Sequence, residues 1–243
     1  MQAERDLAVA AARLAGDRLR DRGTGFDGVV AEDGRDIKLA ADRSAEDLIV
    51  AHLRARSDLA VLGEETGWHG DRSDRFWVVD PLDGSANYQR RIPICAVAIA
   101  LVDGDRPVLG AIHDFNNDET YAGGEGLPAT LNGEPISVSD IGEPGRAVLI
   151  SGLPVKADYS PEALGAMAAE FANWKKVRMM GSAAMAAAYV ASGKVDRYAE
   201  TGVRLWDVAA GMALVRAAGG RADISPGAPE APRTIRLDNG RLP

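Results

Sequence analysis

Apolar and polar positions divide the chain into a helical start, a strand-rich middle and a mixed second half. Apolar residues recur at helical spacing over 3–20 and again over 43–56, which predicts a pair of N-terminal helices. The turn-rich segment 23–34 between them is predicted to be a loop. Short β-prone apolar runs follow, and the turn at Asp103-Gly104-Asp105 is typical of a hairpin. The strands predicted from these runs are 59–62, 76–79, 92–101, 108–115, 119–122 and 129–138.

The pattern changes at 142–145, where Pro144 and two glycines indicate a boundary. Beyond it, strands are predicted at 148–151, 195–199 and 234–237, and helices at 161–172, from Ser182 to Gly193, and from Trp206 to Gly219. We therefore expect an N-terminal α+β subdomain over 1–144 and a C-terminal α/β subdomain over 145–243.

Composition restricts the compartment and the classes of partner. With 243 residues and 46% hydrophobic content, the chain can bury a large core. A net charge of −8, with no basic stripe, argues against nucleic acids and acidic membrane surfaces as partners. The first 20 residues lack the apolar core of a signal peptide, and no run is long enough to span a bilayer. Cys95 is the single cysteine, which fits a reducing compartment, so we predict a cytoplasmic protein.

The segment Trp77–Tyr88 carries the strongest chemical signal. A buried strand ends at two carboxylates three positions apart, Asp80 and Asp83, and Pro81 between them favours a tight turn. Gly84 and Ser85 then begin a predicted helix, whose N-terminal N–H groups and dipole attract anions. Carboxylates beside such a helix start can hold a cation and an anion together, so the segment predicts a metal bound with a phosphate.

Further acids lie at the ends of predicted elements. Glu64 and Glu65 follow the strand 59–62, and Asp207 lies in the first turn of a helix. If the strands 59–62 and 76–79 are neighbours, Glu64 and Asp80 meet at one edge of the sheet. Two carboxylates 4 Å apart repel by about 4 kcal/mol at an effective dielectric of about 20, so such a cluster favours metal loading. A set of oxygen ligands suits Mg²⁺ or Mn²⁺.

Simpler interpretations exist for several of these residues. Asp42 precedes the helix 43–56 and fits an N-cap as well as a catalytic group, and Ser182 equally fits a helix cap. The pair Glu64-Glu65 is also typical of a polar loop, and Asp207 is favourable in any first helical turn.

Three acidic segments nevertheless stand in one order along the chain. Residues 63–65 read Gly-Glu-Glu, 80–88 read Asp-Pro-Leu-Asp-Gly-Ser-Ala-Asn-Tyr, and 206–211 read Trp-Asp-Val-Ala-Ala-Gly. Each resembles a signature motif of the inositol monophosphatase family, and Ser85 stands where that family usually has threonine. The resemblance implies an α/β (α+β) layered sandwich of alternating helix and sheet layers, shared with fructose-1,6-bisphosphatase. It also implies a Mg²⁺-dependent, lithium-sensitive phosphomonoesterase.

Carried over by motif position, the resemblance assigns two or three Mg²⁺ ions. Glu64, Asp80 and the carbonyl of Leu82 would hold the first ion, and Asp80, Asp83 and Asp207 the second, while Glu64 would assist a weaker third. Mn²⁺ is a possible substitute.

The same resemblance assigns the reacting groups. The N–H groups of Gly84 and Ser85 would bind the phosphate, and Glu65 would support the site. Either Ser85 paired with Asp42, or Glu64, would activate the attacking water, and this alternative stays open.

Substrate contacts are implied at Asp83, at Gly181-Ser182-Ala183 and at Glu200. The Asn87-Tyr88 pair resembles the inositol monophosphatase and fructose-bisphosphatase branches more than the bisphosphate nucleotidases. The expected substrate is a small phosphorylated polyol or sugar, foremost inositol monophosphate. Other substrates in the class are fructose 1,6-bisphosphate, 3′-phosphoadenosine 5′-phosphate and histidinol phosphate. The resemblance further implies a homodimer. A different class of function remains, a regulatory binding partner, because one bacterial family member associates with the transcription machinery.

Overall fold

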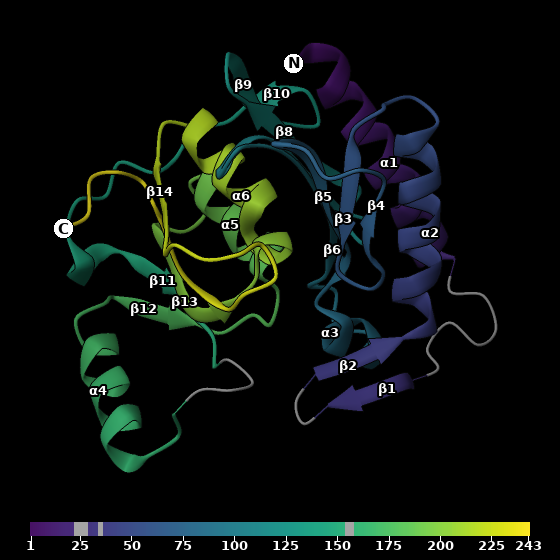
Figure 1. Ribbon diagram of the computed structural model, residues 1–243. Coiled ribbons are helices and arrows are strands. Elements are labelled where there is room, and N and C mark those ends of the chain that lie inside the picture. Colours follow the sequence, from purple (N-terminus) through teal and green to yellow (C-terminus); the bar gives the residue numbers. More distant parts are fainter. Residues whose placement is uncertain (22–28, 34–35, 154–157) are drawn as a thin grey trace.

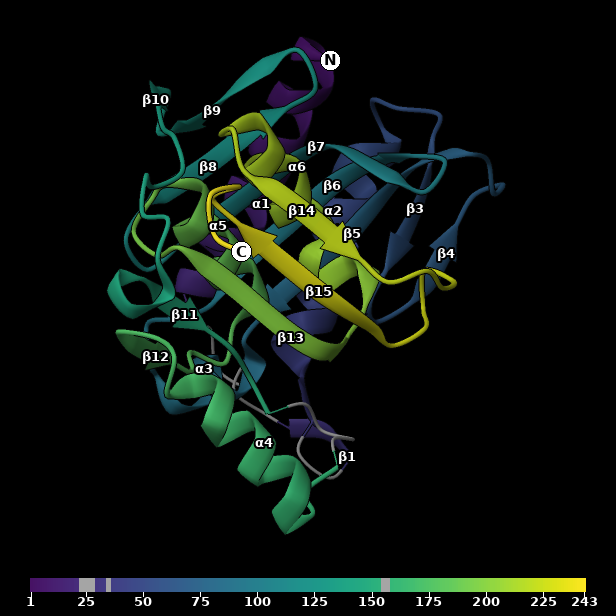
Figure 2. The ribbon, with the colours of Figure 1, turned by 90° about the vertical axis from the view of Figure 1, so that its left-hand side faces the viewer.

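Helices and sheets alternate in layers around a central helix pair (Figures 1 and 2). The computed structural model describes residues 1–21, 29–33, 36–153 and 158–243. An eight-stranded sheet and a five-stranded sheet enclose α5 and α6, while α1 and α2 cover the outer face of the larger sheet. The predicted layered sandwich is confirmed.

The helices are α1 (Gln2–Arg20), α2 (Ala40–Arg54), α3 (Ser85–Arg90), α4 (Pro161–Phe171), α5 (Ala183–Ala191) and α6 (Leu205–Ala217), with a 3₁₀ turn at Pro144–Arg146. The strands of the first half are β1 (Val29–Asp33), β2 (Asp36–Leu39), β3 (Ala60–Gly63), β4 (Gly67–His69), β5 (Arg75–Asp83), β6 (Ala96–Asp103), β7 (Arg106–Asp114), β8 (Glu119–Gly124), β9 (Leu127–Leu131) and β10 (Glu134–Pro135). Those of the second half are β11 (Val148–Ile150), β12 (Lys176–Arg178), β13 (Arg197–Val203), β14 (Arg221–Ile224) and β15 (Arg233–Asp238).

The larger sheet has the strand order β10-β9-β8-β7-β6-β5-β3-β4. Its strands are antiparallel except for β3 and β5, which run parallel with Gly63 opposite Val79. The inner strands are apolar on both faces because helices cover both sides, so they read as continuous hydrophobic runs. The strands that precede Glu64 and Asp80 are thus neighbours, which meets the condition for these two acids to lie at one edge of the sheet.

The outer face of this sheet is sealed by α1 and α2. Helix α1 buries Ala8, Ala11, Ala12, Ala15 and Leu19, which are positions three or four apart on one face. These small side chains let the helix lie close to the sheet, where Tyr88 donates a hydrogen bond to the Leu19 carbonyl at 2.7 Å. This contact holds α3, which directly follows the strand that carries Asp80 and Asp83, against α1.

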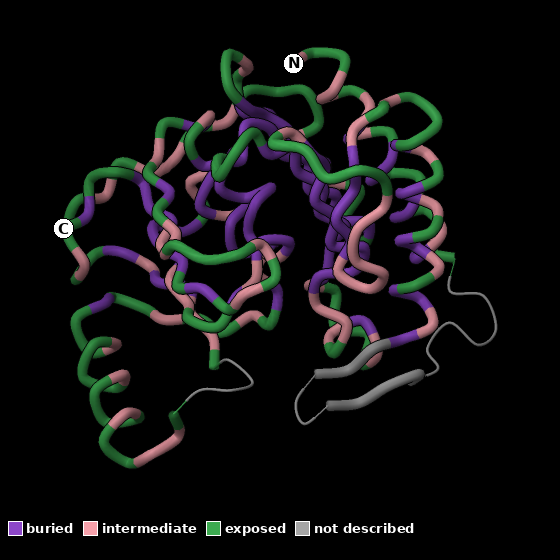
Figure 3. The backbone as a smooth tube through the Cα atoms, in the orientation of Figure 1, coloured by how far each residue is buried: buried purple, intermediate pink, exposed green. Residues whose placement is uncertain are grey.

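Helices α5 and α6 fill the space between the two sheets (Figure 1). Both are apolar nearly all round, as expected for helices buried on every side, and most of their residues are buried (Figure 3). Since α6 packs against both sheets, it carries its first turn, with Asp207, to the carboxyl end of β5. The packing of α6 in the core therefore sets the position of Asp207 relative to the acids on the larger sheet.

The smaller sheet has the order β12-β11-β13-β15-β14. The chain passes into it between β10 and β11, on either side of Pro144, so the change of pattern there marks the change of sheet. The division into subdomains 1–144 and 145–243 stays a prediction, and one cluster of buried apolar side chains runs through both parts. None of the described helices combines the length and apolar character needed to cross a membrane.

Three expectations about local structure were wrong. Part of the turn-rich segment before α2 is the hairpin β1–β2, whereas residues 22–28 and 34–35 lie outside the described residues. Helix α2 begins at Ala40, so Asp42 is its third residue and not its N-cap. Strand β5 continues through Asp83, so both aspartates lie within the strand and not on a turn after it.

Candidate metal centre

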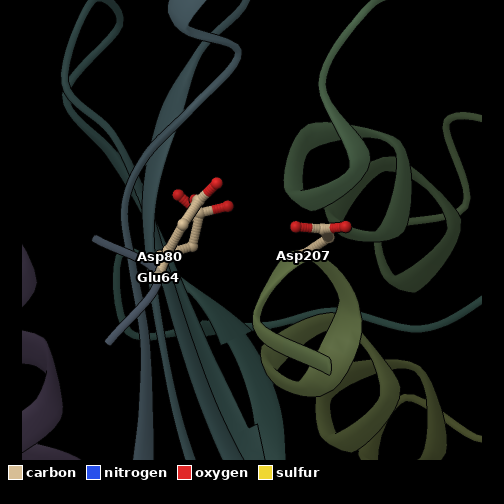
Figure 4. Close-up of side chains that lie close together, drawn as sticks. All are labelled: Glu64, Asp80 and Asp207. Carbon is tan, nitrogen blue, oxygen red and sulfur yellow. The ribbon is translucent and has the colours of Figure 1, made fainter. Parts of the chain in front are cut away.

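Three carboxylates from distant parts of the sequence converge at the carboxyl end of β5. Oxygens of Glu64, Asp80 and Asp207 all lie within 4.8 Å of one another. Figure 4 shows Glu64 and Asp80 projecting from the sheet toward Asp207, which projects back from the start of α6. Parallel pairing of β3 with β5 places the first two side by side, and Glu64 N–H donates to the Val79 carbonyl at 3.2 Å.

The electrostatics of this cluster favour a cation. Burial, followed by the nearby charge of Glu64, raises the pKa of Asp80 well above its usual value. Burial also raises the pKa of Asp207 to about 7, although the Arg204 N–H donates to its carboxylate at 2.6 Å. Converging carboxylate oxygens are the ligands that Mg²⁺ and Mn²⁺ prefer, so these residues fit such an ion.

Asp83 lies beside this cluster but is tied to α5. Its carboxylate accepts a hydrogen bond from the Ser182 hydroxyl. It also accepts from the N–H groups of Ala183 and Ala184, both at 3.0 Å. Burial raises its pKa to about 6, against the lowering effect of these donors. Asp83 therefore links the strand that bears Asp80 to the start of a helix in the second half.

The residues expected to contact substrate have observable structural roles. The Ser182 hydroxyl accepts from the Met185 N–H at 3.2 Å, so Ser182 caps α5, as its simpler interpretation predicted, while also donating to Asp83. The Gly181 carbonyl accepts from the Asn87 side-chain amide at 3.3 Å. The Asn87–Gly181 contact joins α3 to the loop before α5.

Ser85 and Asp42 form the expected pair. The Ser85 hydroxyl lies 2.7 Å from Asp42 Oδ1 and 3.0 Å from the Leu82 carbonyl oxygen. Asp42 Oδ2 accepts from the Leu39 N–H at 2.5 Å, which stabilises the start of α2 from the third helical position. Burial raises the pKa of Asp42 to about 6, so its carboxylate is near its titration range at neutral pH.

The turn between β5 and α3 depends on Gly84. Its φ of 88° lies in the left-handed region, and a Cβ there would lie 2.9 Å from the Ile94 carbonyl oxygen. The register with β6 shifts between Asp80 and Asp83, so the strand carries a bulge there. Pro81 fits this place because it lies beyond the last pairing with β3, where a ladder N–H is not needed.

Glu200 lies on β13, at the side of the site formed by the smaller sheet. Its carboxylate accepts from the Tyr198 hydroxyl at 3.0 Å, and burial raises its pKa to about 7. The charge of Asp83 raises the pKa of Glu200 further. The strand predicted to end before Glu200 continues to Val203.

Comparison with known proteins decides the relationship. The model of the inositol monophosphatase family matches residues 1–238. The chain belongs to that family. It is 38% identical over 232 residues to the Nus factor SuhB of Xylella fastidiosa, covering 94% of this chain and 84% of that protein. It is 38% identical over 205 residues to an inositol-1-monophosphatase of Mesorhizobium japonicum, covering 83% of this chain and 75% of that protein.

A solved structure gives the same result at the level of the fold. The inositol monophosphatase from Anabaena superposes with a TM-score of 0.85 at 32% identity, covering 99% of this chain and 92% of that chain. The family generally uses Mg²⁺, and the acidic cluster of this member is suited to it. The relatives thus include proteins named for two different activities, phosphatase and Nus factor.

One residue beneath the centre was missed by sequence reasoning in this family member. Glu46 is fully buried on α2, and its carboxylate accepts from the N–H groups of Glu65 at 2.9 Å and Thr66 at 2.8 Å, and from the Thr66 hydroxyl. A Cβ on Gly63 would collide with this carboxylate, which explains the glycine before the two glutamates. The sequence did contain a signal for it: Glu46 lies three and seven positions before Ile49 and Leu53, so it is an acid on the buried apolar face of the helix.

Proposed function

We propose that this chain is a Mg²⁺-dependent phosphomonoesterase that hydrolyses a small phosphorylated polyol or sugar, foremost inositol monophosphate. The observation that carries the proposal is the convergence of Glu64, Asp80 and Asp207 within 4.8 Å, from both halves of the chain. A neighbouring hydroxyl–carboxylate pair, Ser85 with Asp42, supplies a proton acceptor at the same place.

Two ion sites fit the oxygen ligands of the chain, with a weaker third. Glu64, Asp80 and the Leu82 carbonyl would hold one Mg²⁺, and Asp80, Asp83 and Asp207 the other, with Mn²⁺ as a substitute. When bound, the ions supply positive charge for the phosphate and lower the pKa of coordinated water. Glu65 supports the site from the turn that Glu46 holds.

Ser85 and Asp42 orient the attacking water. Asp42 Oδ1 accepts the Ser85 hydroxyl proton, which leaves a lone pair on Ser85 Oγ to accept a proton from that water. Since the pKa of Asp42 is raised to about 6, its carboxylate is ionised at neutral pH yet basic enough to take up a proton. Glu64 is the competing base, and the N–H groups of Gly84 and Ser85 would bind the phosphate.

Recognition of the alcohol part falls to the second half of the chain. Glu200 presents a carboxylate that accepts hydrogen bonds from polyol hydroxyls, and it already accepts one from Tyr198. Asp83 and the segment Gly181-Ser182-Ala183 would border the same space. Fructose 1,6-bisphosphate, 3′-phosphoadenosine 5′-phosphate and histidinol phosphate are the alternative substrates.

A regulatory role is the second candidate function. It is favoured by the similarity to proteins named Nus factor SuhB, at 38% identity over 94% of this chain. In that role the chain would act through a protein partner, and we expect a homodimer in either case.

The decisive experiment measures phosphate release from the four substrates with and without Mg²⁺ and Li⁺. We expect Asp80→Asn to abolish Mg²⁺-dependent release while circular dichroism shows an unchanged fold. The matched control is Asp114→Asn, since Asp114 is equally buried but accepts hydrogen bonds from Asn116 and Asn117. Full activity in Asp80→Asn would refute the assignment, and no release by the unaltered protein from any substrate would favour the regulatory role.

A further inference from the structure

An exposed hydrogen bond joins two segments 162 positions apart. Trp68 Nε1 on β4 donates to Glu230 Oε1 at 2.9 Å. Glu230 lies between β14 and β15, on the loop that extends to β4 in Figure 2. This hydrogen bond lowers the pKa of Glu230, so the acceptor is an ionised carboxylate at neutral pH, which strengthens the bond.

On the sheet side, Trp68 is closely connected to two of the metal-site acids. Strand β4 follows the turn that holds Glu64, and Leu62 pairs with Trp68 across β3 and β4. The Trp68 ring packs on Phe76 with centroids 4.9 Å apart, and Phe76 lies on the strand that bears Asp80. The Arg72 guanidinium covers the ring at 4.7 Å. The indole therefore has a fixed position relative to both acids.

On the helix side, the loop of Glu230 is connected to Asp207. The carbonyl of Pro229, the residue before Glu230, accepts from the N–H of Leu205 at 3.2 Å, and Leu205 is the first residue of α6. Asp207 lies two residues further on. The Arg233 side chain donates to the carbonyls of Gly227 and Ala228, which ties the same loop to β15. Movement of the loop would thus be transmitted to the first turn of α6.

We propose that the Trp68–Glu230 pair is a latch that sets the separation of Asp207 from Glu64 and Asp80 and so strengthens metal binding. Trp68 and Glu230 are positioning residues, since they act through the acids. The physical basis is preorganisation: ligands held at the binding separation need no reordering when the ion arrives. This inference rests on the metal site of the proposed function.

The test is a calorimetric Mn²⁺ titration of Trp68→Phe, Glu230→Ala and the double variant. Trp68→Phe keeps an aromatic ring against Phe76 and removes the N–H. Because the Trp68–Glu230 bond is exposed, its loss should raise the Mn²⁺ dissociation constant by only about three- to tenfold in each single variant, less than for a buried bond to a charged group. Because both changes remove the same bond, the double variant should be no weaker than either single one. At saturating Mn²⁺ the turnover rate should be unchanged.

The matched control is Trp174→Phe. Trp174 Nε1 donates to Glu170 Oε1 at 3.0 Å, so it also forms an indole–carboxylate hydrogen bond. Glu170 lies in α4 and Trp174 just after it, away from Glu64, Asp80 and Asp207. We expect unchanged Mn²⁺ affinity in this control. Unchanged affinity in both latch variants, or additive losses in the double variant, would overturn the latch. The titration needs no turnover, so weaker Mn²⁺ binding in a protein that releases no phosphate would support the latch while the proposed function fails.

Discussion

Replacing Glu46 with glutamine tests how the acidic turn is held above α2. The carboxylate accepts three hydrogen bonds, from the N–H groups of Glu65 and Thr66 and from the Thr66 hydroxyl. Because that hydroxyl donates its only proton to Glu46, it must accept from His69 Nε2, which lies 2.5 Å away. Glu46 thereby orders the whole segment from Glu65 to His69.

The expected loss of stability follows from this donor count. Glutamine keeps one acceptor oxygen but turns an NH₂ group toward at least one N–H donor, in a site with no exposure to water. A buried hydrogen bond to a charged group contributes about 1.5–3 kcal/mol, and an unsatisfied buried donor costs about 1–3 kcal/mol. We therefore expect Glu46→Gln to lower the free energy of unfolding by about 2–4 kcal/mol.

The assay is urea denaturation of the metal-free protein in EDTA, followed by Mn²⁺ titration of the folded variant. Mn²⁺ binding should weaken, because Glu64 precedes the turn that loses its support. Asp47→Asn is the matched control: Asp47 lies next to Glu46 on the same helix but is exposed and pairs with Arg43. Equal stability and equal Mn²⁺ affinity of Glu46→Gln and Asp47→Asn would refute the reasoning.

Two further predictions concern the second half of the chain. Ser182→Ala removes the cap of α5 and a hydrogen-bond donor to Asp83, so the free energy of unfolding should fall by about 1–2 kcal/mol. Thermal melts measure this loss, and an unchanged melting temperature would contradict it. Glu200 has its pKa raised from 4.5 to about 7 by burial, so the folded state holds a proton that the unfolded chain has lost between these pH values. Its contribution to stability in EDTA should therefore fall as pH rises from about 4.5 to about 7, and Glu200→Gln should show a shallower fall between pH 5 and 8. Equal pH dependence of the two proteins would exclude this origin.

Sequence reasoning succeeded where short-range pattern determines structure. The helices α1, α4 and α5 and the hairpin of β6 and β7 were predicted within a few residues because apolar periodicity, caps and turn residues are local. The pairing of β3 with β5 was only a condition in the sequence analysis, and the structure supplies it. The convergence of Glu64, Asp80 and Asp207 agrees with the ligand set implied by the family motifs.

Features set by tertiary contacts could not be predicted in this way. Strand β12 is exposed and polar, and it forms by pairing with β11, so it shows no hydrophobic alternation. The bulge that keeps Asp80 and Asp83 within one strand depends on register with β6. The sequence around Asp42 indicates a helix N-cap, whereas its hydrogen-bond donor Ser85 lies 43 positions away in the chain.

The electrostatics of the centre connect metal binding to the cohesion of the fold. Burial raises the pKa of Asp80, Asp83 and Asp207, and the charges of neighbouring acids raise the pKa of Asp80 and Asp207 further. Ionising all three at neutral pH therefore opposes the approach of α6 to β5. A bound cation reverses the sign of this contribution, because the same carboxylates then attract one common charge. Contacts that need no metal, the Trp68–Glu230 bond and the Ser182–Asp83 bond among them, hold the two halves together against that repulsion. An ion at the proposed site would therefore bind to ligands already close to their final arrangement, and its binding energy would add to contacts that the fold has formed beforehand.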